Sequence, residues 1–236
     1  MSRAASGART GGRLGYVGLV RVTHLGHACL LVSIADRRIL IDPGNFSSGF
    51  EDLRDLDAII VTHNHPDHFD PGPAGRVVRD NPNASVHTDP LTAEKLREEG
   101  LPARPTRQGE PFEVGDVTVH PVGELHAFNH PAMERIPNVG VVLRADGEPS
   151  LFHPGDAYDA EPGPVDVLAH PLNAPWAASR DSIAFVARIA PRAMTPIHDA
   201  LLSDVGRRMY AGHIENFSGV EGLTYTDLRD GESTTF

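Results

Sequence analysis

The sequence of 236 residues is short of cysteine, of aromatic residues and of long apolar runs. Cys29 is the only cysteine, so an intrachain disulfide and a zinc cluster built from thiolates are both excluded. No run reaches the roughly 18 apolar residues of a membrane-spanning helix. A chain with these properties fits the reducing cytoplasm best, and we expect a cytoplasmic protein with no membrane partner.

Positive charge is also scarce. The chain has 21 Lys and Arg residues against 32 Asp and Glu residues, a net charge of −11, and only 6% aromatic residues. A surface that binds nucleic acid needs a basic groove or an aromatic stacking platform, so we expect no nucleic-acid partner. A bound metal can reverse the field inside one pocket, so a small substrate, even a phosphorylated one, stays open. The sequence leaves the oligomeric state unknown and is compatible with a homo-oligomer.

Residues 1–18 differ in composition from the rest of the chain. The stretch MSRAASGARTGGRLGYVG is basic and rich in Gly, Ser and Ala, but it lacks the continuous apolar core of a signal peptide. We expect it to be a disordered leader. No linker-like composition interrupts residues 19–236, which we expect to form one domain.

Short apolar runs separated by turn residues dominate the domain. Residues 28–35 (ACLLVSIA) and 37–44 (RRILIDPG) are typical of strands. Residues 56–63 (LDAIIVTH) contain the continuous apolar run expected of a strand that is covered on both faces. Further strand-like runs follow after residue 113, and Asp146-Gly147 predicts a hairpin turn between two of them.

Three stretches predict helices. Residues 89–100 begin with Asp89 as N-cap and stop at Gly100, and residues 179–191 gather apolar side chains on one helical face. Residues 201–214 are the third candidate. The order of strands, helices, strands and helices favours two packed sheets with helices outside, an α/β sandwich.

The stretch VTHNHPDHFD contains the pattern His63-x-His65-x-Asp67-His68 immediately after a buried strand. Two histidines at i and i+2 can point the same way, because side chains alternate along a strand. If the chain then turns back, the aspartate and the last histidine face them. Imidazole and carboxylate are ligands for Zn²⁺, Mn²⁺ or Fe, so the pattern predicts the start of two adjacent metal sites.

Two metals need more ligands, and rigid strand ends are the places to look for them. His126 follows VTVHPVGEL, Asp156 ends LFHPGDA, and His198 lies in MTPIHDA. A carboxylate has two oxygens and can bridge two cations, so Asp156 is the natural bridge. His120 competes with His126 as a ligand, and we favour His126 because strand ends line a cleft while strand middles seldom do.

Together these residues resemble the metallo-β-lactamase-fold hydrolases. The resemblance rests on H-x-H-x-D-H at residues 63–68, the histidine at 126, Gly155-Asp156 and P-x-H at 196–198. Near the start, VTHLGHACLLV and ILIDPG resemble the branch that contains the L-ascorbate-6-phosphate lactonase and related zinc-dependent hydrolases.

This resemblance implies a four-layer αββα sandwich with the metals in a cleft at one edge of the two sheets. It also implies a ligand set for each metal: His63, His65 and His126 for the first, Asp67, His68 and His198 for the second, and Asp156 as the bridge between them.

The chain departs from several branches of this family. The presence of Asp156 argues against the antibiotic-cleaving branch, and His65 stands where the di-iron flavoprotein branch has a glutamate. The chain is too short for the inserted domain usual in the RNA-cleaving branch. HPLNAPWAAS at residues 170–179 replaces a glycine-containing stretch of the lactonase relatives, so the substrate stays open.

We therefore expect a metal-dependent hydrolase that acts on a small molecule. Two divalent cations about 3.5–4 Å apart lower the pKa of a shared water, and the resulting metal-bound hydroxide can attack a lactone, an ester or a phosphodiester. We expect two Zn²⁺ ions, with Mn²⁺ or Fe²⁺ as alternatives. Asp67 and Asp156 are the expected catalytic carboxylates, Asp67 by orienting the nucleophile or accepting its proton.

Two other functions compete with this one. A phosphodiesterase or nuclease of the same fold would act on nucleic acid, against which the net charge of −11 argues. A non-catalytic metal-binding protein would keep the ligands without turnover. The complete set of seven proposed ligands weighs against a degenerate site.

Other polar residues near the strand ends are candidates for supporting roles. Asp42, at the end of ILID, is a candidate partner for the outer N–H of a metal-bound imidazole. His153 alternates away from Asp156 along its strand, which favours a structural role. The candidates for substrate contact, each with a purely structural role as the alternative, are His27, His130, His170, Asn173 and Trp176.

Overall fold

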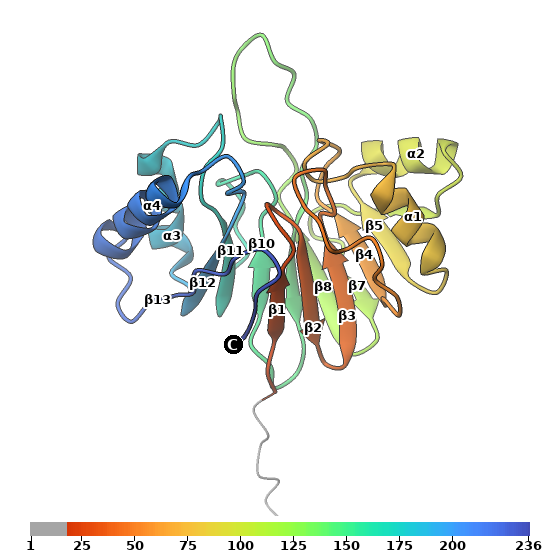
Figure 1. Cartoon of the computed structure of the whole chain (residues 1–236), viewed down its shortest axis with the longest axis horizontal. Coiled ribbons are helices and arrows are strands. Elements are labelled where there is room, and N and C mark those ends of the chain that lie inside the picture. The colour runs from red at the N-terminus through yellow and green to blue at the C-terminus, as the bar shows by residue number, and fades with distance from the viewer. Residues whose placement is uncertain (1–17) are drawn as a thin grey trace, which may run out of the picture.

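The computed structural model describes residues 18–236, which form a four-layer αββα sandwich (Figure 1). The leader expected at residues 1–18 lies outside the described residues, apart from Gly18. The four layers confirm the fold class expected from the order of strands and helices, with two sheets face to face and helices on both outer sides.

The first sheet has the strand order β14-β1-β2-β3-β4-β5-β6. β14, β1, β2 and β3 pair antiparallel, and β3 to β6 run parallel. Its strands are β1 (Arg21–His24), β2 (Leu30–Ile34), β3 (Arg37–Ile41), β4 (Ala58–Val61), β5 (Ser85–Thr88), β6 (Ala103–Pro105) and β14 (Ser233–Thr235).

The second sheet has the order β13-β12-β11-β10-β9-β8-β7 and repeats this pattern in reverse. β7 to β10 pair antiparallel, and β10 to β13 run parallel. Its strands are β7 (Phe112–Val114), β8 (Val117–Val122), β9 (Gly140–Arg144), β10 (Leu151–His153), β11 (Val167–Pro171), β12 (Ala193–Ile197) and β13 (Thr224–Tyr225). The predicted hairpin at Asp146-Gly147 joins β9 to β10, and Gly147 adopts the positive φ of 78° that such a turn requires.

Helices cover the outer face of each sheet (Figure 1). The helices of the described residues are α1 (Pro73–Asp80), α2 (Pro90–Glu98), α3 (Ser179–Ile189) and α4 (Asp204–Phe217). The predicted cap of α2 is present, because the Asp89 carboxylate accepts from the N–H groups of Leu91 and Thr92, both at 3.0 Å. α1 follows the metal-ligand motif and was not expected from the sequence, where Pro71, Gly72 and Pro73 hide its start.

The period-two alternation of the strands explains the layers. In β4, Ala58 and Ile60 belong to the apolar core between the two sheets, while Ile59 and Val61 belong to the core under α1 and α2. This confirms the expectation that the run at residues 56–63 is covered on both faces. A third apolar core lies between the second sheet and α3 and α4. A separate feature positions the site: the ends of the parallel strands β4, β11 and β12 meet at one edge of the sandwich.

That edge is also where a long loop between β8 and β9 projects from the body of the molecule (Figure 1). Phe128 and Met133 in this loop are 57% and 55% exposed. Among residues 18–236, no helix is both long and apolar enough to cross a lipid bilayer.

Candidate metal centre

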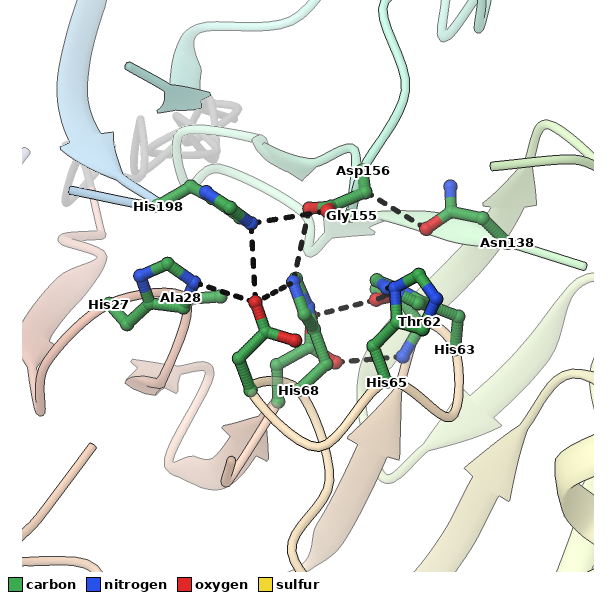
Figure 2. A network of polar contacts seen from close by, with 12 residues as sticks. His27, Ala28, Thr62, His63, His65, His68, Asn138, Gly155, Asp156 and His198 are labelled. Carbon is green, nitrogen blue, oxygen red and sulfur yellow. Dashed lines mark hydrogen bonds and ion pairs between the residues drawn. The ribbon is translucent and has the colours of Figure 1, made fainter. Parts of the chain in front are cut away.

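The motif at residues 63–68 forms a tight loop directly after β4. The backbone folds back on itself, so that the N–H groups of His68 and Phe69 both donate to the His65 carbonyl at 2.9 Å. This turn brings His63, His65 and His68 to one side of the loop (Figure 2). The reversal expected from the sequence is therefore present.

Loops of the second sheet bring the remaining candidate ligands to the same place. His126 follows β8, Asp156 follows β10 and His198 follows β12. The Asp156 carboxylate lies at the centre, with Oδ1 3.0 Å from Nε2 of His68 and Oδ2 3.1 Å from Nε2 of His198 and 3.3 Å from Nε2 of His126. Oδ2 is shared by His126 and His198 and Oδ1 faces His68, so the carboxylate lies between the expected ligands of both ions.

The candidate ligands fall into two groups, and within each group the ligand atoms all lie within 4.8 Å of one another. The first group is His63, His65, His126 and Asp156, and the second is His27, Asp67, His68 and His198. The seven residues expected as ligands are thus brought together, and His27 joins them.

Four of the histidines are fixed in orientation by their Nδ1 atoms. These contacts join His63 to the Thr62 hydroxyl at 3.0 Å, His68 to the Asp42 carboxylate at 2.7 Å, His126 to the Ala127 carbonyl at 2.8 Å and His198 to the Asn173 carbonyl at 2.7 Å. A carbonyl or carboxylate can only accept, and the Thr62 hydroxyl gives its own proton to Asp42. Each Nδ1 therefore carries a hydrogen, which leaves Nε2 as the atom that can bind a cation once it is free of its own proton.

Several of these central atoms are buried and lack a hydrogen-bond partner of acceptable geometry. They are Nε2 of His68, His126 and His198, and Oδ1 of Asp156. The distances to Asp156 are short, but the angles do not suit hydrogen bonds. Buried polar atoms without partners are costly, and converging lone pairs of nitrogen and oxygen are what a divalent cation binds. The residues present therefore fit one or two metal ions.

Asp42 fixes the positions of Thr62 and His68. Its carboxylate accepts from the N–H and the hydroxyl of Thr62, both at 2.7 Å, and from Nδ1 of His68. It is fully buried. Asp42 thus orients His68 directly and His63 through Thr62, the supporting position expected for it.

Gly44 allows the segment after β3 to approach the motif closely. A Cβ at Gly44 would lie 1.9 Å from the Asp67 carbonyl oxygen and 2.5 Å from the His68 nitrogen. The contact is reinforced by the Asn45 N–H, which donates to the Pro66 carbonyl at 2.8 Å. Only glycine fits here without moving the backbone that carries Asp67 and His68.

The electrostatics of the cluster favour bound cations. Burial lowers the pKa of His63 and of His65, and the neighbouring histidines lower it further. Burial alone would raise the pKa of Asp67 and Asp156, but the surrounding imidazoles hold both below the usual range. Burial likewise lowers the pKa of His198, yet the two carboxylates outweigh it and raise this pKa to about 9. The site thus attracts positive charge, which a proton or a metal ion can supply.

His27 lies inside the cluster, although the sequence left its role open. Its Nε2 is 3.1 Å from Oδ2 of Asp67, and its ring centre is 4.0 Å from that of His198. The Ala200 N–H donates to its Nδ1 at 3.4 Å, so Nε2 carries the hydrogen and donates to Asp67. Burial lowers the pKa of His27 to about 4, which keeps this imidazole neutral. The geometry fits a residue that orients Asp67.

Asn138 and Trp176 both bind Asp156. The Asn138 side chain accepts from the Asp156 N–H at 2.9 Å (Figure 2). It also donates to the Pro154 carbonyl at 3.0 Å, and the two bonds fix the turn after β10. The Trp176 indole N–H donates to Oδ2 of Asp156 at 3.0 Å. Sequence reasoning missed Asn138, because it lies in an irregular loop with no motif or period. It placed Trp176 near the substrate but not on the carboxylate.

The remaining candidates lie at other places. His120 is half-buried on β8 and faces the opposite end of the sandwich with the hairpin residues Ala145 and Asp146, so the choice of His126 fits the geometry. His153 is buried and bonds to the Ala28 carbonyl at 2.9 Å, in line with a structural role. His130 is exposed in the projecting loop.

His170 differs from the expected substrate contact, whereas the half-buried Asn173 stays a candidate for it. Asn173 supplies its backbone carbonyl to His198. His170 is fully buried, bonds to the Ser182 hydroxyl at 2.9 Å and stacks on Tyr158. Its ring is closed off from solvent because β11 carries it under α3 rather than into the cleft, and this corrects the expectation of a substrate contact.

Comparison with known proteins identifies the class. The sequence profile of the family described as "Beta-lactamase superfamily domain" matches residues 21–198. The chain is 38% identical over 211 residues to Protein Rv0786c of Mycobacterium tuberculosis, covering 89% of this chain and 95% of that protein. It is 29% identical to the UPF0173 metal-dependent hydrolase PYRAB05000 of Pyrococcus abyssi, over 76% of this chain and 84% of that protein.

A solved structure agrees with these sequence relatives. Igni18, a metallo hydrolase from the archaeon Ignicoccus hospitalis, superposes with a TM-score of 0.72 at 19% identity, covering 92% of this chain and 98% of that one. The fold and the cluster at its edge define a protein of the metallo-β-lactamase fold. The chain belongs to the β-lactamase superfamily.

We predict that Gly44→Ala weakens metal binding. The new methyl group would force the Asp67–His68 peptide away and spread the ligands, so we expect the Zn²⁺ affinity to fall at least about tenfold and the protein to lose roughly 1–3 kcal/mol of stability. Titration with Zn²⁺ and urea unfolding measure the two effects. Gly212→Ala in α4 is the control, since the nearest atom to its new Cβ is at 3.9 Å. Equal Zn²⁺ affinity in both variants would contradict the argument.

We predict that His170 makes the metal-free protein sensitive to acid. Burial lowers its pKa to about 3, so the folded state resists a protonation that the unfolded chain accepts near pH 6.5. The contribution of the neutral, buried His170 to the free energy of unfolding is present above pH 6.5 and is lost as the pH falls toward 3. When the pH falls from 6.5 to 5, the free energy of unfolding of His170→Phe should decrease by roughly 1–2 kcal/mol less than that of the wild type. Met133→Ala, which removes an exposed side chain without a titratable group, should keep the pH dependence of the wild type; urea unfolding at several pH values measures all three proteins.

Proposed function

We propose that the protein is a metal-dependent hydrolase that uses two divalent ions to cleave an ester, a lactone or a phosphodiester bond in a small molecule. The observation that carries this proposal is the convergence of imidazole Nε2 atoms on the buried carboxylate of Asp156, with Nδ1 fixed by an oxygen in four of the histidines. Membership of the β-lactamase superfamily and the names of relatives such as the Pyrococcus hydrolase support it.

The assignment of ligands follows the two groups. His63, His65 and His126 would hold the first ion, Asp67, His68 and His198 the second, and Asp156 would bridge them. Mixed nitrogen and oxygen donors of this kind suit Zn²⁺, with Mn²⁺ or Fe²⁺ as alternatives. The absence of thiolate ligands is consistent with any of the three.

The bound ions supply Lewis acidity and lower the pKa of a water held at the site. The other parts of the reaction fall to the chain itself. The Asp67 side chain is 22% exposed, whereas that of Asp156 is 3% exposed, so Asp67 is the carboxylate that substrate and water can reach. His27 keeps Asp67 in place, and Asp67 is positioned to orient the attacking water or to accept its proton.

The negative net charge favours a small molecule over a nucleic acid as the substrate. A net charge of −11 gives little attraction for a polyanion, so a nucleic acid is the less favoured substrate. We infer a cytoplasmic location from the single cysteine, which is buried and unpaired.

The proposal predicts that activity depends on both metal and Asp156. Hydrolysis of a p-nitrophenyl ester or of bis(p-nitrophenyl) phosphate should be abolished by a chelator and restored by Zn²⁺ or Mn²⁺. Asp156→Ala should lose most of the bound metal, measured by elemental analysis, and at least about a hundredfold in rate, while the circular dichroism spectrum stays close to that of the wild type.

Asp116→Ala is the matched control, because this aspartate is exposed and lies at the opposite end of the sandwich. It should retain metal content and rate. Hydrolysis by Asp156→Ala at the wild-type rate, or wild-type turnover in the presence of chelator, would refute the dinuclear mechanism.

A further inference from the structure

A cavity of about 520 Å³ lies next to the metal centre, under the projecting loop. Four aromatic side chains line it: Phe128, Tyr158, Trp176 and Phe185. The Tyr158 ring lies 4.9 Å from the ring of Trp176, edge to face, and 4.9 Å from that of Phe185, stacked. The Tyr158 hydroxyl donates to the Pro171 carbonyl and is not free to bind a ligand. Aromatic side chains therefore form one part of the lining of this cavity, which we call the aromatic pocket; the charged part is Arg135, Asp159, Asp181 and Arg188.

The aromatic pocket and the metal centre share a wall. The Trp176 ring lines the pocket while its N–H donates to the Asp156 carboxylate at 3.0 Å. Ala127, also in the pocket lining, follows the candidate ligand His126 and donates its N–H to the Asp156 carbonyl at 2.7 Å. One side chain thus separates the pocket from the carboxylate at which the candidate ligands converge. A molecule whose reacting bond lies at the metals can extend past Trp176 into the pocket.

The charged groups around the pocket already have partners. Arg188 donates to the carbonyls of Tyr158 and Ala160, and its guanidinium lies 5.5 Å from the centre of the Phe185 ring. Arg135 donates from Nε to the His126 carbonyl at 2.7 Å and pairs with Asp159 at 3.5 Å. The lining also contains Asp181, which pairs with Arg180 at 3.2 Å. Two arginines and two aspartates balance in charge, so the pocket has no strong preference for an anion.

Phe128 is the exposed member of the pocket. Its side chain is 57% exposed on the projecting loop, whereas Phe185 is buried. A large aromatic side chain with this much water contact gains free energy when an apolar ligand covers it. Cavities of about this size are typical of small-molecule sites.

We propose that the aromatic pocket binds a neutral apolar arm of the substrate, an aryl or medium-chain alkyl group. This rests on the proposed function and narrows it to apolar carboxylic esters or lactones, ahead of phosphodiesters. The metal centre cleaves the bond, and the pocket selects the group attached to it.

Binding can be tested apart from catalysis, because Trp176 is the only tryptophan of the chain and lines the pocket. The full chain is kept in chelator, so that a carboxylate cannot bind through a metal, and titrated with octanamide while tryptophan fluorescence is recorded. We expect a saturable change with octanamide, a dissociation constant at least about tenfold weaker with acetamide, and binding of octanoate no tighter than that of octanamide. No saturable response, or tighter binding of octanoate, overturns the proposal.

Two variants of the projecting loop locate the binding site. Phe128→Ala should weaken octanamide binding about tenfold, because it removes an apolar wall of the pocket. Met133→Ala is the matched control, since Met133 is 55% exposed on the same loop and does not line the pocket. It should bind octanamide as the wild type does. Equal weakening in both variants, or in neither, overturns the assignment.

Hydrolysis separates this proposal from the proposed function. With Zn²⁺ present, kcat/KM for methyl octanoate should exceed that for methyl acetate at least about tenfold, and Phe128→Ala should reduce this ratio while Met133→Ala preserves it. Chelator-sensitive hydrolysis of both esters at equal rates upholds the hydrolase and rejects the pocket. Saturable octanamide binding without hydrolysis of any ester upholds the pocket as an apolar binding site and rejects its role in ester cleavage.

Discussion

The buried carboxylate of Asp156 is the constraint on which the rest of the site depends. It faces the Nε2 atoms of three histidines that come from both sheets, and it also accepts the indole N–H of Trp176. An anion this deeply buried is stable only when positive charge or hydrogen bonds surround it. The edge of the sandwich supplies both, and bound cations would complete the neutralisation.

Buried hydrogen bonds fix the surroundings of this carboxylate, although loops carry its neighbours. Backbone carbonyls orient His126 and His198, and the buried Asp42 orients His68 and, through Thr62, His63. Every one of these supports lies within a few residues of a strand end. The two sheets thus hold these loops rigidly. A site needs such rigidity if it is to hold ions at a fixed separation.

Trp176 contacts both the candidate metal centre and the aromatic pocket. Its N–H belongs to the hydrogen bonds of Asp156, and its ring belongs to the wall of the aromatic pocket. A ligand that packs against this ring therefore also touches a group that positions the central carboxylate.

The sequence by itself determined the local features: the strand with two buried faces at residues 58–61, the capped helix α2 and the loop that carries His63 to His68. Each depends on spacing and on neighbours a few residues apart. Only the tertiary structure decided that His27 lies against Asp67, that Asn138 holds the turn at Asp156 and that His170 points under α3. These contacts join residues far apart in the chain, and the direction of each side chain depends on how the two sheets pack, a fact that no local pattern contains.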